Sequence, residues 1–294
     1  MTITAINEEF IMDNIETISL VFSIIGIILS IVFYMIAFIR KRSQTSNHEG
    51  TTSKNNVSVK SWFDITANIT VVIAIIFITV AMISRAIETG HGPFSNMYEF
   101  ALAFSWGIIL AGFVFHLKYK TGSVLNISLI IALLLLIFAR VQYTPPNNLM
   151  PALQQSALLS AHVASAVVAY GTLTIGFVAA VLYLIQNKYN LNWLPELEVL
   201  DNITYKSVII GFPFLTLLII LGALWADIAW GRYWGWDPKE TASLVTWLIY
   251  AAYMHTRLLK GWKGVRASIL LIAGFLAIAF TFFGNYIFSG LHSY

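Results

Sequence analysis

Residues 123–139 read SVLNISLIIALLLLIFA, a run of 17 residues that contains no charged side chain. A helix of this length rises about 25 Å, close to the roughly 30 Å hydrocarbon core of a bilayer. Seven further mostly apolar segments lie at about 17 to 39, 64 to 84, 97 to 116, 157 to 185, 207 to 225, 240 to 256 and 267 to 288. The sequence therefore predicts an all-α fold, a polytopic transmembrane helical bundle of about eight spans.

The composition excludes a water-soluble fold. The chain is 58% hydrophobic and 11% charged, with a mean hydropathy of +0.77, whereas soluble domains carry about 25% charged residues. The net charge of +3 does not indicate a nucleic-acid partner, because the basic residues are placed as markers of membrane orientation. Since the chain has no cysteine, it forms neither a disulfide nor a thiolate metal site, and its six histidines are the candidate metal ligands.

The lysines and arginines between the apolar segments predict the orientation, since cytoplasmic loops are enriched in them. After the first, third, fifth and seventh segments come 13 of the 17: Arg40, Lys41, Arg42, Lys54, Lys60, Lys118, Lys120, Lys188, Lys206, Arg257, Lys260, Lys263 and Arg266. Both termini are therefore expected on the extracytoplasmic side. We expect two regions, residues 1–60 with an N-terminal transmembrane helix and a polar cytoplasmic loop, and residues 61–294 with the other spans.

The third outside loop reads WADIAWGRYWGWDPKE over residues 225–240 and holds four of the nine tryptophans, Trp225, Trp230, Trp234 and Trp236. An interfacial aromatic belt explains one or two tryptophans better than four in a single loop that contains glycines. Tryptophan faces stack on large flat π-systems and exclude water around them. We therefore interpret the cluster as a platform for a flat ligand.

The end of this loop also has a structural explanation. Asp237, Pro238 and Glu240 match an N-cap, a proline at the first helical position and a carboxylate at the third, so they are expected to start the seventh span. Arg232 and Lys239 are among the few basic residues outside. Either could pair with a ligand carboxylate such as a heme propionate, or equally with a lipid phosphate.

The depths of the histidines follow from the helical rise. His162 lies roughly 35 Å from the cytoplasmic end of the fifth span, at the outer boundary, and His292 follows the last span. These two imidazoles could supply both axial ligands of a heme iron beside the tryptophans. His255 is expected roughly 21 Å deeper than the start of the seventh span, where it is either a ligand or a residue bordering the inner interface. His91, in an outside loop, is a possible secondary site residue.

Three stretches carry a family resemblance. Residues 230–240, WGRYWGWDPKE, resemble the WWD signature of heme-handling proteins in cytochrome c maturation. Residues 90–99, GHGPFSNMYE, residues 290–294, GLHSY, and the histidine spacing resemble the CcsA (ResC) family of cytochrome c biogenesis system II. The resemblance runs from about residue 62 to the end, so residues 61–294 are expected to form a cytochrome c assembly (WWD) transmembrane domain.

The resemblance implies a heme conduit and synthase that works with a second membrane protein, CcsB (ResB). His162 and His292 match the family's two outside ligands at the attachment site. His255 matches a third ligand on the inward side, whose other axial ligand comes from the partner. Trp225, Trp230, Trp234, Trp236, Asp237, Arg232 and Lys239 would hold heme b, which is both substrate and ligand.

The resemblance also implies the reaction. Apocytochrome c brings Cys-X-X-Cys-His motifs whose thiols add across the heme vinyl groups, and thiol-reducing proteins take part indirectly. The chain would supply positioning, with no nucleophile and no general acid or base. It would act as a cytochrome c heme lyase only in a complex with its partner. An N-terminus without transit-like composition favours a bacterial plasma membrane, with the tryptophan loop outside, over a thylakoid.

Three other functions fit parts of the pattern. A heme exporter without attachment activity would also need an aromatic platform and histidines at two depths. A related WWD protein that delivers heme to a chaperone is less compatible with the 90–99 stretch and eight spans. An electron-transfer cytochrome b normally needs several histidines inside the bilayer, and only His255 is clearly at depth.

Overall fold

The computed structural model describes residues 3–47, 62–92, 94–145 and 156–284, and they form eight α-helices without a strand. The helices are α1 (Ile3–Asn47), α2 (Trp62–Thr89), α3 (Met97–Tyr119), α4 (Gly122–Val141), α5 (Ser156–Tyr189), α6 (Leu197–Trp230), α7 (Pro238–Leu259) and α8 (Val265–Phe283). Within these residues, seven helices are long and apolar enough to cross a membrane, all except α7. The predicted all-α transmembrane bundle is confirmed.

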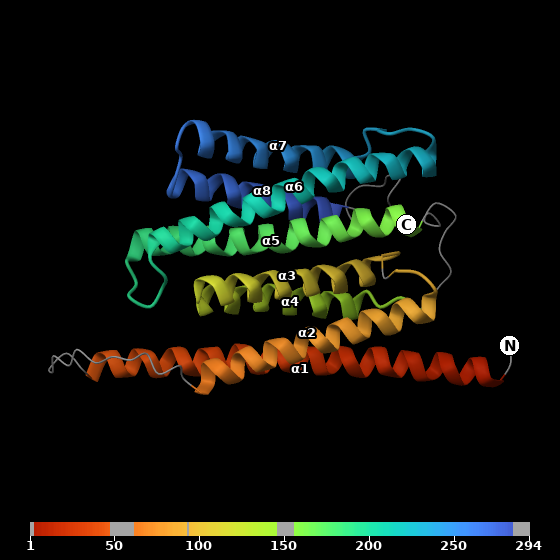
Figure 1. The fold of residues 1–294 in the computed structure, drawn as a ribbon, viewed down its shortest axis with the longest axis horizontal. Coiled ribbons are helices and arrows are strands. Elements are labelled where there is room, and N and C mark those ends of the chain that lie inside the picture. The colour runs from red at the N-terminus through yellow and green to blue at the C-terminus, as the bar shows by residue number, and fades with distance from the viewer. Residues whose placement is uncertain (1–2, 48–61, 93, 146–155, 285–294) are drawn as a thin grey trace.

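The helices lie side by side in a row of antiparallel pairs, from α1 and α2 through α3 and α4 to α5 to α8 (Figure 1). One apolar core joins α1 to α4 with parts of α5 and α6, and a second joins α3 with α5 to α8. Helices α3, α5 and α6 contribute to both cores. Of these, α5 packs against α3, α4, α6 and α8, so it connects the two halves of the bundle.

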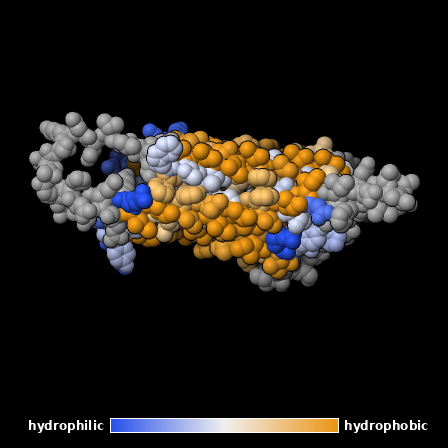
Figure 2. All heavy atoms as spheres, turned by 90° about the horizontal axis from the view of Figure 1, so that it is seen from below, coloured by the Kyte–Doolittle hydropathy of each residue, from blue (hydrophilic) through white to orange (hydrophobic). Residues whose placement is uncertain are grey.

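The surface of the bundle is apolar, as a lipid-facing surface must be. On the face drawn in Figure 2, the middle of the molecule is mostly apolar and hydrophilic residues lie towards its two ends. On α2, the exposed positions Ile69, Ile76 and Ile83 carry large side chains, while the buried positions Ala67 and Ala74 carry small ones. Small residues between helices and large ones towards lipid are typical of membrane bundles, because close helix packing replaces the hydrophobic driving force there.

The boundaries of α6 correct the sequence prediction. The sixth span was expected at 207 to 225, with the outside loop beginning at Trp225, but α6 continues to Trp230. It ends where Gly231 adopts a left-handed conformation, with φ of 70°, and its N–H donates to the carbonyl of Asp227 at 2.8 Å. Such a C-cap favours glycine, which pays no steric penalty at positive φ. Trp225 and Trp230 are therefore helical, and only Trp234 and Trp236 lie in the connecting loop.

Two glycines allow α3 and α5 to approach closely. A Cβ added to Gly107 would lie 2.6 Å from Cγ1 of Val167 and 2.9 Å from its carbonyl oxygen. A Cβ added to Gly171 would lie 2.8 Å from the backbone of Gly107. All three distances are shorter than a non-bonded carbon contact allows, so the close approach of α3 and α5 depends on these two glycines.

We expect Gly107→Ala to lower the free energy of unfolding by about 1–3 kcal/mol, the usual cost of overpacking, because the added methyl meets backbone that cannot rotate away. The measurement is unfolding of the detergent-solubilised chain with increasing sodium dodecyl sulfate. Gly284→Ala is the matched control, since its Cβ would meet nothing within 4 Å and its φ is −59°. Equal stability of the two variants would contradict the tight crossing.

Candidate functional site

The predicted site residues that the structure describes gather at one end of the bundle, apart from His255. The α2–α3 turn with His91, the first turns of α5 with His162 and the α6–α7 connection with the tryptophans all lie at this end (Figure 1). Helix α1 begins and α8 ends at the same end. His292 lies outside the described residues. We call this end the outer end, following the orientation that the basic residues predict.

The four tryptophans form two edge-to-face pairs. The rings of Trp225 and Trp230 have centroids 4.8 Å apart at 73°, and those of Trp234 and Trp236 are 5.9 Å apart at 87°. Trp225 is only 2% exposed, whereas Trp236 is 70% exposed. The buried Trp225 ring therefore packs under the ring of Trp230. Trp236 has an exposed face that a flat ligand can contact.

The loop that carries Trp234 and Trp236 is fixed by the start of α7. Asp237 caps the helix by accepting a hydrogen bond from the backbone N–H of Lys239 at 2.9 Å. The Glu240 carboxylate accepts from the N–H of Gly235 at 2.7 Å and of Asp237 at 3.2 Å. The predicted capping role of these residues is confirmed. Because the Glu240 carboxylate bonds the backbone on both sides of Trp236, this tryptophan stands on a defined backbone.

The two basic side chains near the loop are placed differently. Arg232 is exposed, and its guanidinium lies over Gly235, where an added Cβ would approach the side-chain Nε to 2.9 Å. Lys239 is partly buried, with Nζ 5.8 Å from the centroid of the Phe100 ring on α3. Lys239 therefore connects the start of α7 to α3, with its ammonium group partly buried between them. Arg232 lies on the surface of the bundle.

His162 has a defined ring position and tautomer. Its Nδ1 lies 2.9 Å from the carbonyl oxygen of Leu218 on α6, so Nδ1 carries the proton and donates it. The lone pair is then on Nε2, which is the arrangement that metal-binding histidines use. Gly222 makes the room, because a Cβ there would lie 2.8 Å from Cε1 of His162. This glycine was missed in the sequence, where nothing pairs position 222 with position 162.

We expect Gly222→Ala to displace the His162 imidazole. If His162 ligates heme iron as the sequence predicts, the change should weaken heme binding by about 10–100-fold, as loss of a second-shell contact does at metal sites. Titration of heme into the purified chain, followed by its absorption spectrum, gives the affinity. Leu224→Ala is the control on the same helix, because its side chain is 43% exposed on the bundle surface. An affinity unchanged in both variants would show that the ring position does not matter.

His255 lies on α7 well away from the outer end. It follows Pro238, the first residue of α7, by 17 positions, which is about 26 Å along the helix. It is exposed on the bundle surface. Two residues further on, Arg257 makes a bidentate ion pair with Asp201 of α6, at 2.9 and 2.6 Å. This pair fixes the inner end of α7, so His255 is held at one depth while its side chain faces outwards.

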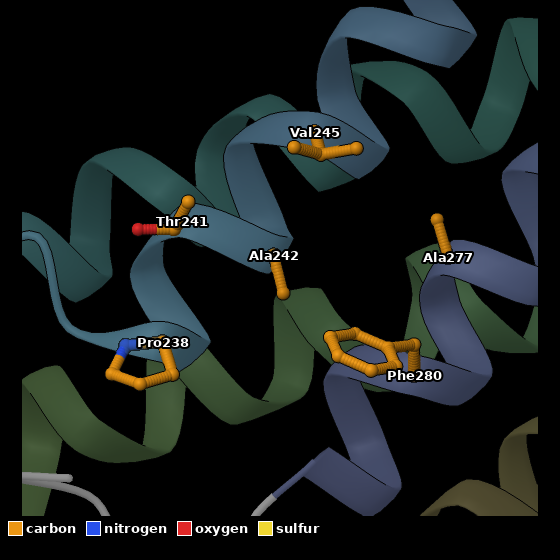
Figure 3. Close-up of a pocket in the computed structure, with 6 residues that line it drawn as sticks. All are labelled: Pro238, Thr241, Ala242, Val245, Ala277 and Phe280. Carbon is orange, nitrogen blue, oxygen red and sulfur yellow. The ribbon is translucent and has the colours of Figure 1, made fainter. Parts of the chain in front are cut away.

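A groove between α7 and α8 was also missed in the sequence. It has a volume of about 490 Å³ and is lined by Pro238, Thr241, Ala242, Val245, Ala277 and Phe280. Figure 3 shows these side chains on the facing sides of the two helices. The groove starts at Pro238, next to the capped end of the tryptophan loop, and its lining is almost wholly apolar. No local pattern reveals it, because its two walls are more than 30 residues apart in the chain.

Residues 94–292 match the family described as "Cytochrome C assembly protein". A relative in Guillardia theta named "Cytochrome c biogenesis protein CcsA" is 37% identical over 253 residues, which cover 76% of this chain and 83% of the relative. Relatives with the same name in Prochlorococcus marinus (strain MIT 9312) and Chlamydomonas reinhardtii are 37% and 38% identical; these matches each cover 74% of this chain, and 81% and 65% of the relatives respectively.

A solved structure named "Cytochrome c Heme Lyase CcmF" shares the fold, with a TM-score of 0.63 at 16% sequence identity. The match covers 93% of this chain and 49% of that one, so this chain spans about half the length of that structure. At this identity the likeness concerns the arrangement of the helices alone.

Proposed function

We propose, from the premise that this chain belongs to the cytochrome c assembly protein family, that it is the heme-handling subunit of a cytochrome c synthase. Family membership and the apolar helices make it an integral membrane protein of cytochrome c biogenesis. The observation that carries the finer proposal is His162, whose ring is held with its lone pair on Nε2 at the end of the bundle where the tryptophans lie.

The residues at the outer end fit heme b as a substrate. His162 and His292 would ligate the iron, and Trp225, Trp230, Trp234 and Trp236 would enclose the ring, with Asp237 holding their loop. Lys239 and Arg232 would pair with the two propionates, Lys239 from inside and Arg232 from the surface. The apolar groove that begins at Pro238 would accept an apolar part of the ligand.

The chemistry requires positioning above all. Each thioether forms when a cysteine thiol of the apocytochrome adds across a vinyl group, so that sulfur bonds one vinyl carbon and the thiol hydrogen ends on the other. No electron is consumed, and the histidine of the Cys-X-X-Cys-His motif then takes over one axial position. The chain's contribution is to hold the vinyl groups at a fixed place and to exclude water around them.

His255 would serve a second heme position with the partner protein. Its imidazole is exposed on α7, the least apolar of the eight helices, at a depth that His162 cannot share. A histidine facing the membrane needs a polar partner or a metal. We propose that CcsB (ResB) covers this face of α7 and supplies the other axial ligand.

The experiment supplies heme from outside and asks whether attachment still needs this chain. Proteoliposomes carrying the chain and its partner receive reduced heme and an apocytochrome c with a Cys-X-X-Cys-His motif, and covalent heme is measured after denaturation. The synthase proposal expects covalent product with the pair and none with an apocytochrome whose two cysteines are serines. Product that forms equally without this chain would favour a heme exporter or delivery protein instead.

The membrane orientation can be tested cleanly because the chain has no cysteine of its own. We propose a bacterial plasma membrane with the tryptophan loop outside. Tyr233→Cys, at an exposed position of that loop, is expected to react with an impermeant maleimide added to intact cells. Lys263→Cys, in the α7–α8 loop, is expected to react only after the cells are opened. The reverse pattern would overturn the orientation.

A further inference from the structure

A buried group of charges lies at the outer end, between α1, α2 and α3. The side chains of Arg85 and Glu99 are 0% exposed and that of Glu16 is 1% exposed. Arg85 Nε donates to Glu99 Oε1 at 3.0 Å, and Arg85 Nη1 lies 3.8 Å from Glu16 Oε2. Tyr98 donates its hydroxyl hydrogen to Glu16. Ionisable residues inside a membrane protein are costly and are usually retained for a function.

This charge cluster holds the far end of the connection between α2 and α3, and a hydrogen bond from α2 closes the near end. At the far end, Glu99 Oε2 accepts hydrogen bonds from the N–H and the hydroxyl of Ser95, at 2.7 and 2.8 Å. At the near end, the Thr89 hydroxyl bonds the carbonyls of Arg85 at 2.8 Å and of His91 at 3.2 Å. The connection is therefore tied to the Glu99 carboxylate at its far end and to the last turn of α2 at its near end.

The residue that this loop presents is His91. Its Nδ1 lies 2.7 Å from the carbonyl oxygen of Gly92, so Nδ1 carries the proton and the lone pair is on Nε2. Nε2 is buried and has no hydrogen-bond partner among the described residues. His162 has the same arrangement, with Nδ1 donating to a carbonyl. In both cases the second shell prepares Nε2 to bind a metal.

His91 and His162 are close enough to serve one site. A Cβ on Gly92 would lie 3.3 Å from the Ser160 hydroxyl, and Ser160 precedes His162 by two residues on α5. The distances from His91 to Gly92, from Gly92 to the Ser160 hydroxyl, and from Ser160 to His162 add up to at most about 17 Å between the Cα atoms of His91 and His162. The loop thus packs on the helix that carries the first predicted iron ligand.

We propose that His91 is an auxiliary ligand for heme iron at the outer end, carried on a loop that Glu99 of the buried cluster holds at Ser95, with its tautomer set by the Gly92 carbonyl. This inference rests on the proposed function, because it assumes that heme binds beside His162. His91 would occupy the iron position opposite His162 when His292 leaves it. The exchange breaks one iron–nitrogen bond and forms another; no electron is transferred, and the proton on Nδ1 stays in its bond to the Gly92 carbonyl.

The test compares optical and electron paramagnetic resonance spectra of the chain purified with its partner and its heme. In His292→Ala, low-spin heme is expected to persist, because His91 takes the vacated position. In His91→Ala with His292→Ala, low-spin heme is expected to fall by about tenfold or more relative to His292→Ala alone. Adding free imidazole is expected to restore it, which shows that the lost group is a ligand. His116→Ala with His292→Ala is the control, since His116 lies at the inner end, against Tyr34.

Three results would overturn the inference. They are loss of low-spin heme in His292→Ala alone, identical spectra for His292→Ala with and without His91→Ala, and failure of imidazole to restore the double variant. The last result would show that low-spin heme is lost through damage to the fold and not through the loss of a ligand. Failure of the proposed function looks different, because His162→Ala would then leave the heme spectrum unchanged as well. The positioning role of Glu99 has its own test. Glu99→Gln in the His292→Ala background should lower low-spin heme as His91→Ala does, although His91 is still present.

Discussion

Replacing His162 by alanine is expected to remove low-spin heme from the purified chain. The side chain lies between α5 and α6, with Nδ1 bonded to the Leu218 carbonyl. Since the imidazole is proposed as a direct ligand, its loss should exceed the about 10–100-fold effect of second-shell changes at metal sites. The measurement is heme content and absorption spectrum after purification.

Added imidazole separates the ligand role from a packing role. It can enter the space left by the side chain and bind iron, so low-spin heme should return in His162→Ala if the fold is intact. The same addition should not rescue Gly222→Leu, where the space itself is filled. Wild-type heme content in His162→Ala would remove this residue from the site and leave the tryptophan loop to serve another ligand.

The largest loss of stability is expected from Arg85→Met. This change keeps the volume of the side chain but leaves the carboxylates of Glu16 and Glu99 buried without their positive partner. Removing one member of a buried ion pair costs about 3–5 kcal/mol, because an uncompensated charge stays in a medium of low dielectric. Unfolding in sodium dodecyl sulfate should show the loss directly.

Two comparisons isolate the charge effect. Arg140→Met removes an exposed arginine from the same end of the bundle, where its guanidinium lies 5.4 Å from the Tyr143 ring, and should change stability little. Adding Glu16→Gln and Glu99→Gln to Arg85→Met removes the buried negative charges and should recover part of the loss. If Arg140→Met and Arg85→Met are equally stable, the buried cluster does not hold the three helices together.

Local features were predictable because they depend on neighbours in the chain. Each of the eight apolar segments corresponds to a helix, since a bilayer requires backbone hydrogen bonds to be satisfied within the segment. The cap formed by Asp237 and Glu240 was predicted from a spacing of three residues and is present. The predicted end of the sixth span was wrong by five residues, because it followed the apolar run, while the helix continues to Gly231, the glycine that ends it.

The sequence alone determined the transmembrane helical class, the family resemblance and the tryptophan cluster, because apolar length and short motifs are written in adjacent residues. It predicted His162 as a ligand, yet the tautomer comes from Leu218 and the space from Gly222, both about 60 residues away. The sequence predicted no role for Arg85 or Glu16. The tertiary structure decided their roles, since burial and pairing depend on which helices pack together.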